Sequence, residues 1–296
     1  MLDRFFKLSE HGTSVRTEVM AGITTFLTMA YIIFVNPDIL SVSGIPKDSV
    51  FVATCLAAAL GSAIMGFYAN YPIALAPGMG LNAYFAFAVV KGMGFTWQAA
   101  LGAVFVSGVL FVIVSLFRLR EAIVNAIPRS LKFAISAGIG LFLAIIGLKS
   151  AGIITSHPAT LVTLGDLHNP GTLLAIVGFM LIVALEQRKV PGASVLMGLT
   201  PFGGVVALPP SIAPTFMQMD IAGALNAGLL TVVLTFFMVE LFDASGTLIG
   251  VCHRAGLLDA EGKLPRLKKA LLADSGAIVA GAMLGTSSTT AYVESA

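Results

Sequence analysis

The sequence predicts an all-α polytopic membrane protein in which short extended pieces interrupt two of the helical segments. The first observation is the composition: 57% of the residues are hydrophobic and 11% are charged, with a mean hydropathy of +0.95. A soluble domain carries about 25% charged residues. The second observation is that long apolar runs recur from about Gly22 to the end of the sequence. Together these features exclude a single large soluble core.

The apolar runs define the individual spans, since a membrane-crossing helix needs about 20 apolar residues. Pairs and clusters of Pro, Gly and Asn separate them, for example Asn36-Pro37 after the first span and Pro209-Pro210 after the seventh. In chain order the predicted spans are 21–35, 50–67, 73–90, 99–117, 131–148, 173–185, 192–208, 229–251 and 271–284. A tenth, partly polar segment covers 285–296.

The basic residues predict the orientation of these spans. Most of the 17 lysines and arginines cluster before the first span and after the fourth, sixth and eighth spans. The positive-inside rule therefore places the N-terminus in the cytoplasm. Lys189 and Arg254 share that side only if an even number of crossings separates them. We therefore expect 192–208, although short, and 229–251 to form an out-and-back pair.

The third span is broken by Pro77, Gly78 and Gly80. Broken backbone is not tolerated where it faces lipid. We therefore expect an extended piece, shielded by protein, and then a half-helix that begins near Asn82. Freed N–H groups at the positive end of such a helix bind acceptor atoms of a small polar ligand. A simple helix cap is the alternative role for Asn82.

The tenth segment repeats this theme. Residues 285–290 form a run of Gly, Thr and Ser that tolerates extended structure, and Glu294 lies where a new helix would begin. Ala-Gly pairs at 21–22 and 222–223 mark the start of the first span and the approach to the eighth. Interrupted segments at matching places in two halves indicate a midplane binding site in an inverted-repeat transporter.

Two acids, Asp243 and Glu294, lie within these apolar stretches. A charged side chain in lipid costs about 2.5–3.5 kcal/mol on insertion scales, so such residues usually face a protein interior or a watery cavity. Thr247 at i+4 and Glu240 at i−3 project from the same helix face as Asp243. The alternative, favoured for Glu240, is that this face emerges into the cytoplasm. For Glu294 the alternative is a residue near the chain end without a fixed partner.

The sequence resembles the AzgA-like purine permeases, which are hypoxanthine, guanine and adenine transporters of the nucleobase–ascorbate transporter superfamily. Four motifs carry the resemblance, and they extend over nearly the whole chain: TFLTMAYIIFVNP (25–37), APGMGLNAYFAF (76–87), VELFDASGTLIGV (239–251) and TSSTTAYVESA (286–296). The resemblance implies fourteen segments as two inverted sets of seven, a core domain that binds substrate, a gate domain, and proton-coupled uptake.

By motif position, Asp243, Glu294 and Asn82 match the family's substrate-site residues of segments eight, ten and three. Thr247 and Tyr292 match neighbours of the pocket. The resemblance also implies a core domain built from 1–117 and 221–296, with gate domain 118–220 between them in sequence. The sequence departs from the family's pattern in two places: the chain ends within segment ten, and segment seven is shortened between Leu199 and Thr200. A C-terminally truncated permease, inactive in transport, is therefore one expectation.

We therefore expect a transporter of the inner (plasma) membrane that takes up a purine nucleobase, and not an enzyme. A carboxylate accepts from ring N–H groups, while Asn82 donates to ring acceptors. Burial favours the protonated form of a carboxylic acid, so Asp243 or Glu294 could carry the coupling proton. The expected partners are the purine, protons and membrane lipid, without nucleic acid, cofactor or metal, and a homodimer is left open.

Two other functional classes fit these residues less well. An anion transporter on the same fold would need a basic residue or unopposed helix ends, which two acids disfavour. An intramembrane enzyme would need a motif such as His-Glu-x-x-His or Gly-x-Gly-Asp, and neither occurs.

Overall fold

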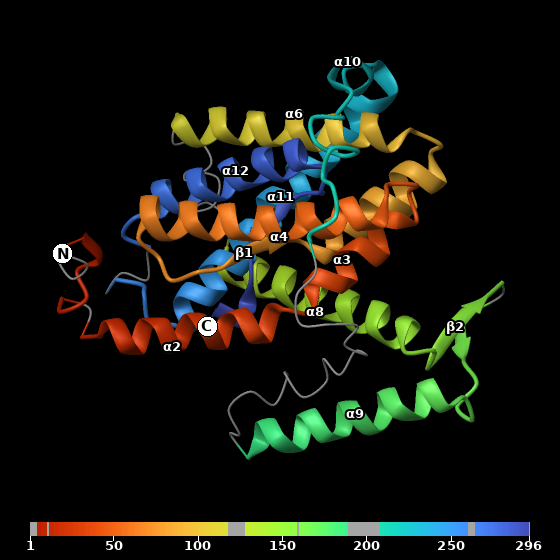
Figure 1. Cartoon of the computed structure of the whole chain (residues 1–296), viewed down its shortest axis with the longest axis horizontal. Helices are drawn as coiled ribbons and strands as arrows, with labels where there is room; N and C mark the ends of the chain where they lie inside the picture. Colours follow the sequence, from red (N-terminus) through yellow and green to blue (C-terminus); the bar gives the residue numbers. More distant parts are fainter. Residues whose placement is uncertain are drawn as a thin grey trace. The chain divides into compact units, whose positions relative to one another are not determined.

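The computed structural model describes residues 5–10, 12–117, 128–158, 160–188, 208–259 and 264–295. The chain divides into a larger compact unit, residues 1–136 with 206–296, and a smaller one, residues 137–205. Figure 1 shows that both units are built mainly from helices. The described elements of the larger unit are α2 (Val15–Met29), α3 (Ile32–Ser41), α4 (Lys47–Ile64), η1 (Met65–Ala69), β1 (Leu75–Pro77), α5 (Met79–Ala83), η2 (Tyr84–Gly92), α6 (Trp97–Leu116), α10 (Ile221–Ala224), α11 (Ala227–Arg254), α12 (Leu267–Leu284), β4 (Thr289–Ala291) and η4 (Val293–Ser295).

The smaller unit contains a two-stranded antiparallel hairpin and an apolar helix. The strands are β2 (Ile154–His157) and β3 (Leu161–Leu164), and the helix is α9 (Pro170–Gln187). Helix α8 (Arg129–Ser150) runs from the sequence of the larger unit into that of the smaller one. The core and gate domains, with boundaries at 117 and 220, remain a prediction, because two compact units do not by themselves show which part is a gate.

Most predicted spans correspond to observed helices. Within the described residues, four helices are long and apolar enough to cross a membrane: Val15–Ser41, Lys47–Ala69, Trp97–Leu116 and Gly228–Arg254. Pro170–Leu185 is a shorter apolar helix. The predicted spans 131–148 and 271–284 correspond to α8 and α12. The predicted span 192–208, with its shortened segment, lies outside the described residues apart from its last residue.

The first predicted span ends at a different place from the one expected. Asn36-Pro37, interpreted from sequence as a boundary, lies inside α3, and the regular helix is interrupted instead between Met29 and Ile32. Proline removes one backbone N–H donor from a helix. Spanning helices tolerate this loss where neighbouring helices satisfy the freed groups. Both Asn36 and Pro37 are buried, so α3 is enclosed at this point.

Helix α12 forms the centre of the larger unit. It packs against α6 and α4, and Figure 1 shows these three helices running side by side. Small residues permit this approach: a Cβ atom at Gly108 of α6 would lie 2.9 Å from the Ile278 side chain of α12. Close packing over small residues is a common way for membrane helices to associate.

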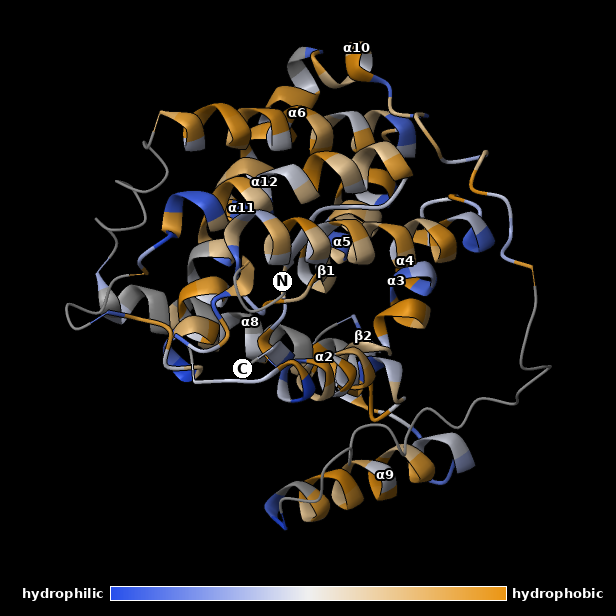
Figure 2. Ribbon diagram, turned by 60° about the vertical axis from the view of Figure 1, so that its left-hand side comes forward, coloured by the Kyte–Doolittle hydropathy of each residue, from blue (hydrophilic) through white to orange (hydrophobic). Residues whose placement is uncertain are grey.

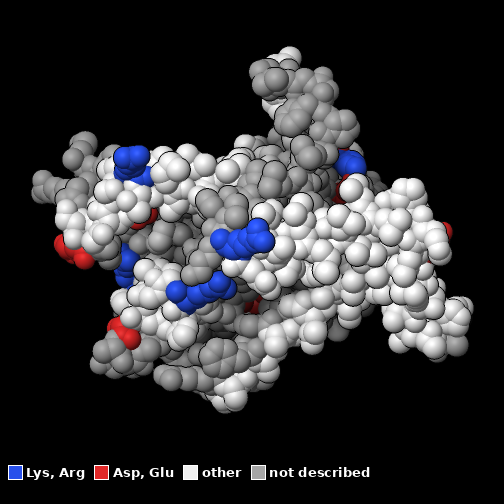
Figure 3. Space-filling view, turned by 90° about the horizontal axis from the view of Figure 1, so that it is seen from below, with Lys and Arg blue, Asp and Glu red and all other residues white. Residues whose placement is uncertain are grey.

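The outer faces of the helices are apolar. Exposed large hydrophobic side chains include Met20 and Phe26 on α2, Leu234 on α11, and Val177 and Phe179 on α9. Figure 2 shows the helices coloured mostly as hydrophobic, and in Figure 3 charged side chains occupy only small areas of the face in view. Water-exposed apolar surface of this extent is unusual in soluble monomers. It is the pattern expected of a multi-pass membrane protein.

Candidate functional site

The two broken segments meet inside the larger unit. β1 pairs antiparallel with β4, and Ala76 lies opposite Thr290 in the centre of the pair. On one side the Gly78 N–H donates to the Ser288 carbonyl at 2.8 Å, and on the other the Tyr292 N–H donates to the Ala74 carbonyl at 3.0 Å. The predicted extended pieces are therefore present, and they complete each other's backbone hydrogen bonds. We call this meeting point the strand crossing.

A short helix follows each strand of the crossing. After β1, helix α5 begins at Met79 with Gly78 at its N-cap, three residues earlier than predicted from Asn82. After β4, the chain forms the single turn η4, which contains Glu294 as expected. Tyr292, between β4 and η4, donates its hydroxyl to the Pro77 carbonyl at 2.7 Å. The Tyr292 side chain thus joins the two broken segments directly.

The polar run before β4 is buried. In the described structure, the hydroxyl oxygens of Ser287, Ser288 and Thr289 are buried without a hydrogen-bond partner. An unsatisfied buried polar group costs about 1–3 kcal/mol, and such groups are few in native proteins. Several of them in succession beside broken helices are typical of a place where a polar ligand binds.

Helix α11 brings Asp243 to this crossing. The carboxyl of Asp243 is close enough to the Thr290 hydroxyl and to Asp274 of α12 to interact with them electrostatically. Thr247 donates its hydroxyl to the Asp243 carbonyl at 2.7 Å, so that hydrogen atom is used within α11. Asp243 therefore faces β4 and α12, and Thr247 lies one turn further along the same helix.

Glu294 is held by Tyr31, a residue that the sequence pattern does not mark as part of a site. The Tyr31 hydroxyl, from the interruption between α2 and α3, donates to Glu294 Oε1 at 2.9 Å. Glu294 is partly buried. Tyr292 lies near enough to Tyr31, Glu294 and Asp243 to interact with them electrostatically. The structure thus gathers three of the predicted site residues around the end of β4, and it adds Tyr31 to them.

Glu240 does not emerge into the cytoplasm, and that expectation was wrong. Its side chain is 2% exposed, and the Ser107 hydroxyl of α6 donates to Glu240 Oε2 at 2.7 Å. Glu240 and Asp243 contact different elements although they lie less than one turn apart. The reason is that α6 covers the side of α11 that carries Glu240, whereas β4 lies beside the side that carries Asp243.

Asn82 lies in a separate buried network. Its amide nitrogen Nδ2 donates to Asn36 Oδ1 of α3. The Asn36 Nδ2 in turn donates to Thr54 of α4 at 2.7 Å and to Thr286 at 2.9 Å. Asn82 Oδ1 is buried without a hydrogen-bond partner in the described structure. Asn36 uses one of the two N–H groups of the Asn82 amide, so the expectation that this amide donates to a ligand stays a prediction. The carbonyl oxygen is a second group that Asn82 offers.

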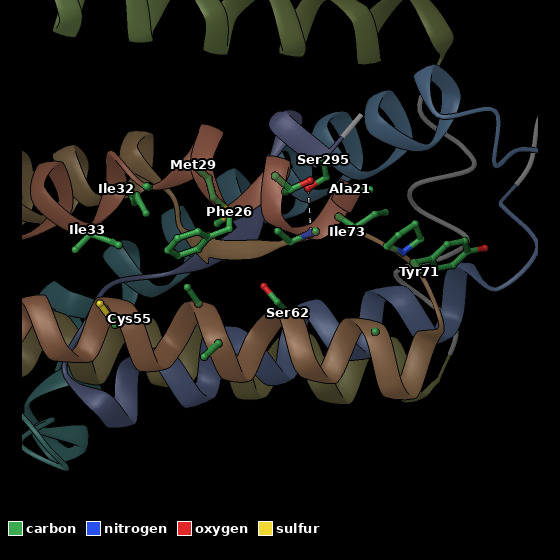
Figure 4. A pocket seen from close by; sticks show the side chains of 18 of the residues that line it. Ala21, Phe26, Met29, Ile32, Ile33, Cys55, Ser62, Tyr71, Ile73 and Ser295 are labelled. Atoms are coloured by element: carbon green, nitrogen blue, oxygen red, sulfur yellow. Dashed lines mark hydrogen bonds between the residues drawn. The ribbon is translucent and has the colours of Figure 1, made fainter. Parts of the chain in front are cut away.

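A cavity of about 610 Å³ adjoins the crossing. Figure 4 shows apolar side chains of α2, α3 and α4 around it, with Ser295 at one wall, where its hydroxyl accepts from the Ala74 N–H. Among the described residues that line it, none of the five predicted site residues occurs. The cavity reaches the neighbour of Glu294 but not the acids themselves. No group of three or more potential metal ligands occurs in the described part of the chain.

Comparison with known proteins gives consistent matches. Residues 16–296 match the permease family. A putative permease from Methanocaldococcus jannaschii is 54% identical over 100% of this chain and 70% of its own length. An adenine permease from Escherichia coli is 49% identical over 100% of this chain and 69% of its length. A guanine/hypoxanthine permease from Bacillus subtilis is 49% identical over 98% of this chain and 71% of its length.

Proposed function

The chain belongs to the permease family, and from that premise we propose that it transports purine nucleobases across the membrane. Its relatives include proteins named as adenine permeases and as guanine/hypoxanthine permeases. The resemblance to purine permeases that the four sequence motifs indicated is therefore confirmed. The protein is a multi-pass membrane transporter and not an enzyme.

The observation that carries the proposal is the convergence of polar groups at the strand crossing. Glu294, Tyr292 and Asp243 are gathered around β4, beside buried hydroxyls that have no partner in the described protein. A purine presents N–H donors and N or O acceptors around a flat ring. Carboxylates accept from ring N–H groups, and the hydroxyls of residues 287–289 donate to ring acceptors. We assign substrate contact to Glu294, Asp243 and Asn82, with Thr247 and Tyr292 as their neighbours.

The transport cycle is proposed in the same terms. Asp243 or Glu294 carries a coupling proton, because a carboxylic acid in a desolvated site can be held in its neutral form. The pairing of β1 with β4 supports the proposed inverted repeat, since each strand comes from one of the two interrupted segments. The core domain, 1–117 with 221–296, moves against a gate domain, 118–220, in the inner membrane, with the N-terminus cytoplasmic.

Binding of radiolabelled adenine, guanine and hypoxanthine to the purified protein in lipid nanodiscs tests the function. We expect saturable binding that an unlabelled purine displaces and that sulfate or bicarbonate does not. Uptake into proteoliposomes, with an inward proton gradient and with that gradient dissipated, tests coupling separately. Displacement by sulfate, or the absence of saturable binding for all three purines, would overturn the proposal.

A further inference from the structure

Four buried polar side chains connect α3, α4, α5 and the segment that precedes β4. They are Asn36, Thr54, Asn82 and Thr286, and the solvent exposure of each is 0%. Because water does not reach them, their hydrogen bonds must be made within the protein or with a ligand. The directions of these hydrogen bonds therefore carry information about what the site can bind.

The direction of the network is fixed at Thr54. Its hydroxyl donates its single hydrogen to the Val50 carbonyl, one helical turn earlier in α4, at 2.6 Å. The Thr54 oxygen can therefore only accept from Asn36, so the Asn36 atom 2.7 Å away must be the amide nitrogen. An amide that presents its nitrogen to Thr54 presents its oxygen to the other side, where Asn82 lies.

The same reasoning fixes Asn82. Since Asn36 offers an oxygen, Asn82 must meet it with its amide nitrogen, as the structure shows. The Asn82 carbonyl oxygen then points away from Asn36, and it has no partner in the described protein. The assignment of oxygen and nitrogen in an asparagine normally follows from such a network. Here a backbone carbonyl of α4 determines it through two side chains.

We propose that Asn36 is a specificity-determining positioning residue, which holds Asn82 so that a hydrogen-bond acceptor faces the substrate. This inference rests on the proposed purine transport and deepens it. The site then selects a nucleobase edge that carries an N–H donor at this position. Asn82 lies in the first turn of α5, whose N-cap is Gly78, and the Gly78 N–H donates to the Ser288 carbonyl. Asn82 is therefore placed at the same crossing as the unpartnered hydroxyls of residues 287–289.

Without Asn36, the Asn82 amide is free to rotate by half a turn and to present either its oxygen or its nitrogen. A wrong base edge leaves a buried polar group unpaired in the native site, which lowers affinity by about 10- to 100-fold. A rotating amide adapts to either edge. Removal of Asn36 should therefore reduce discrimination between ligands more than it reduces affinity for the preferred one.

The test compares the affinity of each nucleobase with that of analogues that lack one N–H donor. Examples are adenine against purine, which lacks the 6-amino group, and guanine against hypoxanthine, which lacks the 2-amino group. In the natural protein we expect one donor deletion to reduce affinity by about 10- to 100-fold. We call the affinity for the nucleobase divided by that for its donor-deleted analogue the discrimination ratio. In Asn36→Ala this ratio should fall below about threefold, and the donor-deleted analogue should bind more tightly than it does to the natural protein.

Two further variants separate positioning from folding. Asn36→Asp still places an oxygen toward Asn82, so it should keep the donor discrimination although it disturbs Thr54 and Thr286. Thr54→Val, of nearly the same volume, removes the acceptor that orients Asn36 and should lower the discrimination ratio in the same direction as Asn36→Ala. Ser43→Ala is the control, since Ser43 is buried just after α3 and its hydroxyl bonds only the Leu40 carbonyl among described atoms.

The outcomes distinguish this inference from the proposed function. If the natural protein binds no purine, the function itself is wrong. If the natural protein binds and discriminates, but Asn36→Ala and Thr54→Val keep its discrimination ratio, the inference about Asn36 is wrong and the function stands. An equal loss of discrimination in Asn36→Ala and Asn36→Asp would also overturn the inference, because it would indicate a general disturbance of packing.

Discussion

The two broken segments meet in one strand pair, but their polar residues are held in different ways. After β1 the chain continues through α5 and the π-helix η2, and Asn82 is fully buried in a network from three other places in the sequence. After β4 the chain makes one turn, and the partly buried Glu294 receives a hydrogen bond from Tyr31. We infer that the first segment fixes geometry before a ligand arrives, whereas the second supplies a charge that can adjust.

The largest expected effect concerns the charges around β4. Asp243→Ala and Glu294→Ala should each lower purine affinity by about 100-fold or more, because ring N–H groups lose a charged acceptor in a buried site. Equilibrium binding of the radiolabelled nucleobase measures this. Glu240→Gln is the matched control on α11, since the amide oxygen still accepts from Ser107. Unchanged affinity in Glu294→Ala would remove Glu294 from the site and break the comparison between the segments.

The next prediction separates the two acids by their role in proton coupling. Asp243→Asn keeps most of the hydrogen-bonding shape but cannot exchange a proton, so it should bind purine while its uptake no longer depends on pH. If Glu294 carries the proton instead, Glu294→Gln should behave in this way, and Asp243→Asn should only weaken binding. Proteoliposome uptake at several external pH values decides between them. Full gradient-driven accumulation in both variants would mean that neither acid carries the proton.

The third prediction concerns how the chain enters each segment. Gly285 ends α12 at a φ of +92°, and a Cβ atom there would lie 2.3 Å from Thr215 Cβ. Gly285→Ala should therefore destabilise the protein by at least about 1–3 kcal/mol from backbone strain. Gly78 has a negative φ, and the nearest contact of a Cβ atom there is the Thr290 methyl group at 3.0 Å, so Gly78→Ala should cost less.

Thermal unfolding in detergent measures both changes. Gly276→Ala is the control within α12, because a Cβ atom at Gly276 meets nothing within 4 Å and alanine favours a helix by up to about 1 kcal/mol. Equal destabilisation by Gly285→Ala and Gly78→Ala would contradict this prediction, because it would show that the backbone is constrained equally where the chain enters each segment.

The sequence predicted the features that depend on neighbouring residues, and it did not predict those that depend on contacts between distant ones. The spans and both extended pieces were predictable, because apolar length and clustered Pro and Gly act locally along the chain. Asp243 and Glu294 were found because charge is rare in apolar stretches. Asn36 was interpreted as a loop residue, since an Asn-Pro pair usually marks a turn. Its role depends on Thr54, Asn82 and Thr286, and no local pattern connects positions so far apart in sequence.

Tyr31 was missed for a related reason. A tyrosine in an apolar run has many uses in a membrane protein, as an interfacial anchor among others. Its hydrogen bond to Glu294 joins residues 263 positions apart. Glu240 was predicted to be solvated because it precedes a basic loop. Sequence alone does not show that α6 covers this side of α11, and the burial of Glu240 follows from that packing.

The smallest effect is expected at Tyr31. Tyr31→Phe removes the hydroxyl that donates to Glu294 Oε1 and keeps the ring. Both side chains are partly exposed, so Glu294 is not left fully buried without this donor, and purine affinity should fall by about 3- to 10-fold with little change in thermal stability. Tyr84→Phe is the control, because the Tyr84 ring packs edge-on against Phe236 and the substitution keeps that contact. A loss as large as that of Glu294→Ala would show that Glu294 needs a fixed orientation, as Asn82 does, and the proposed contrast between a rigid first segment and an adjustable second one would have to be given up.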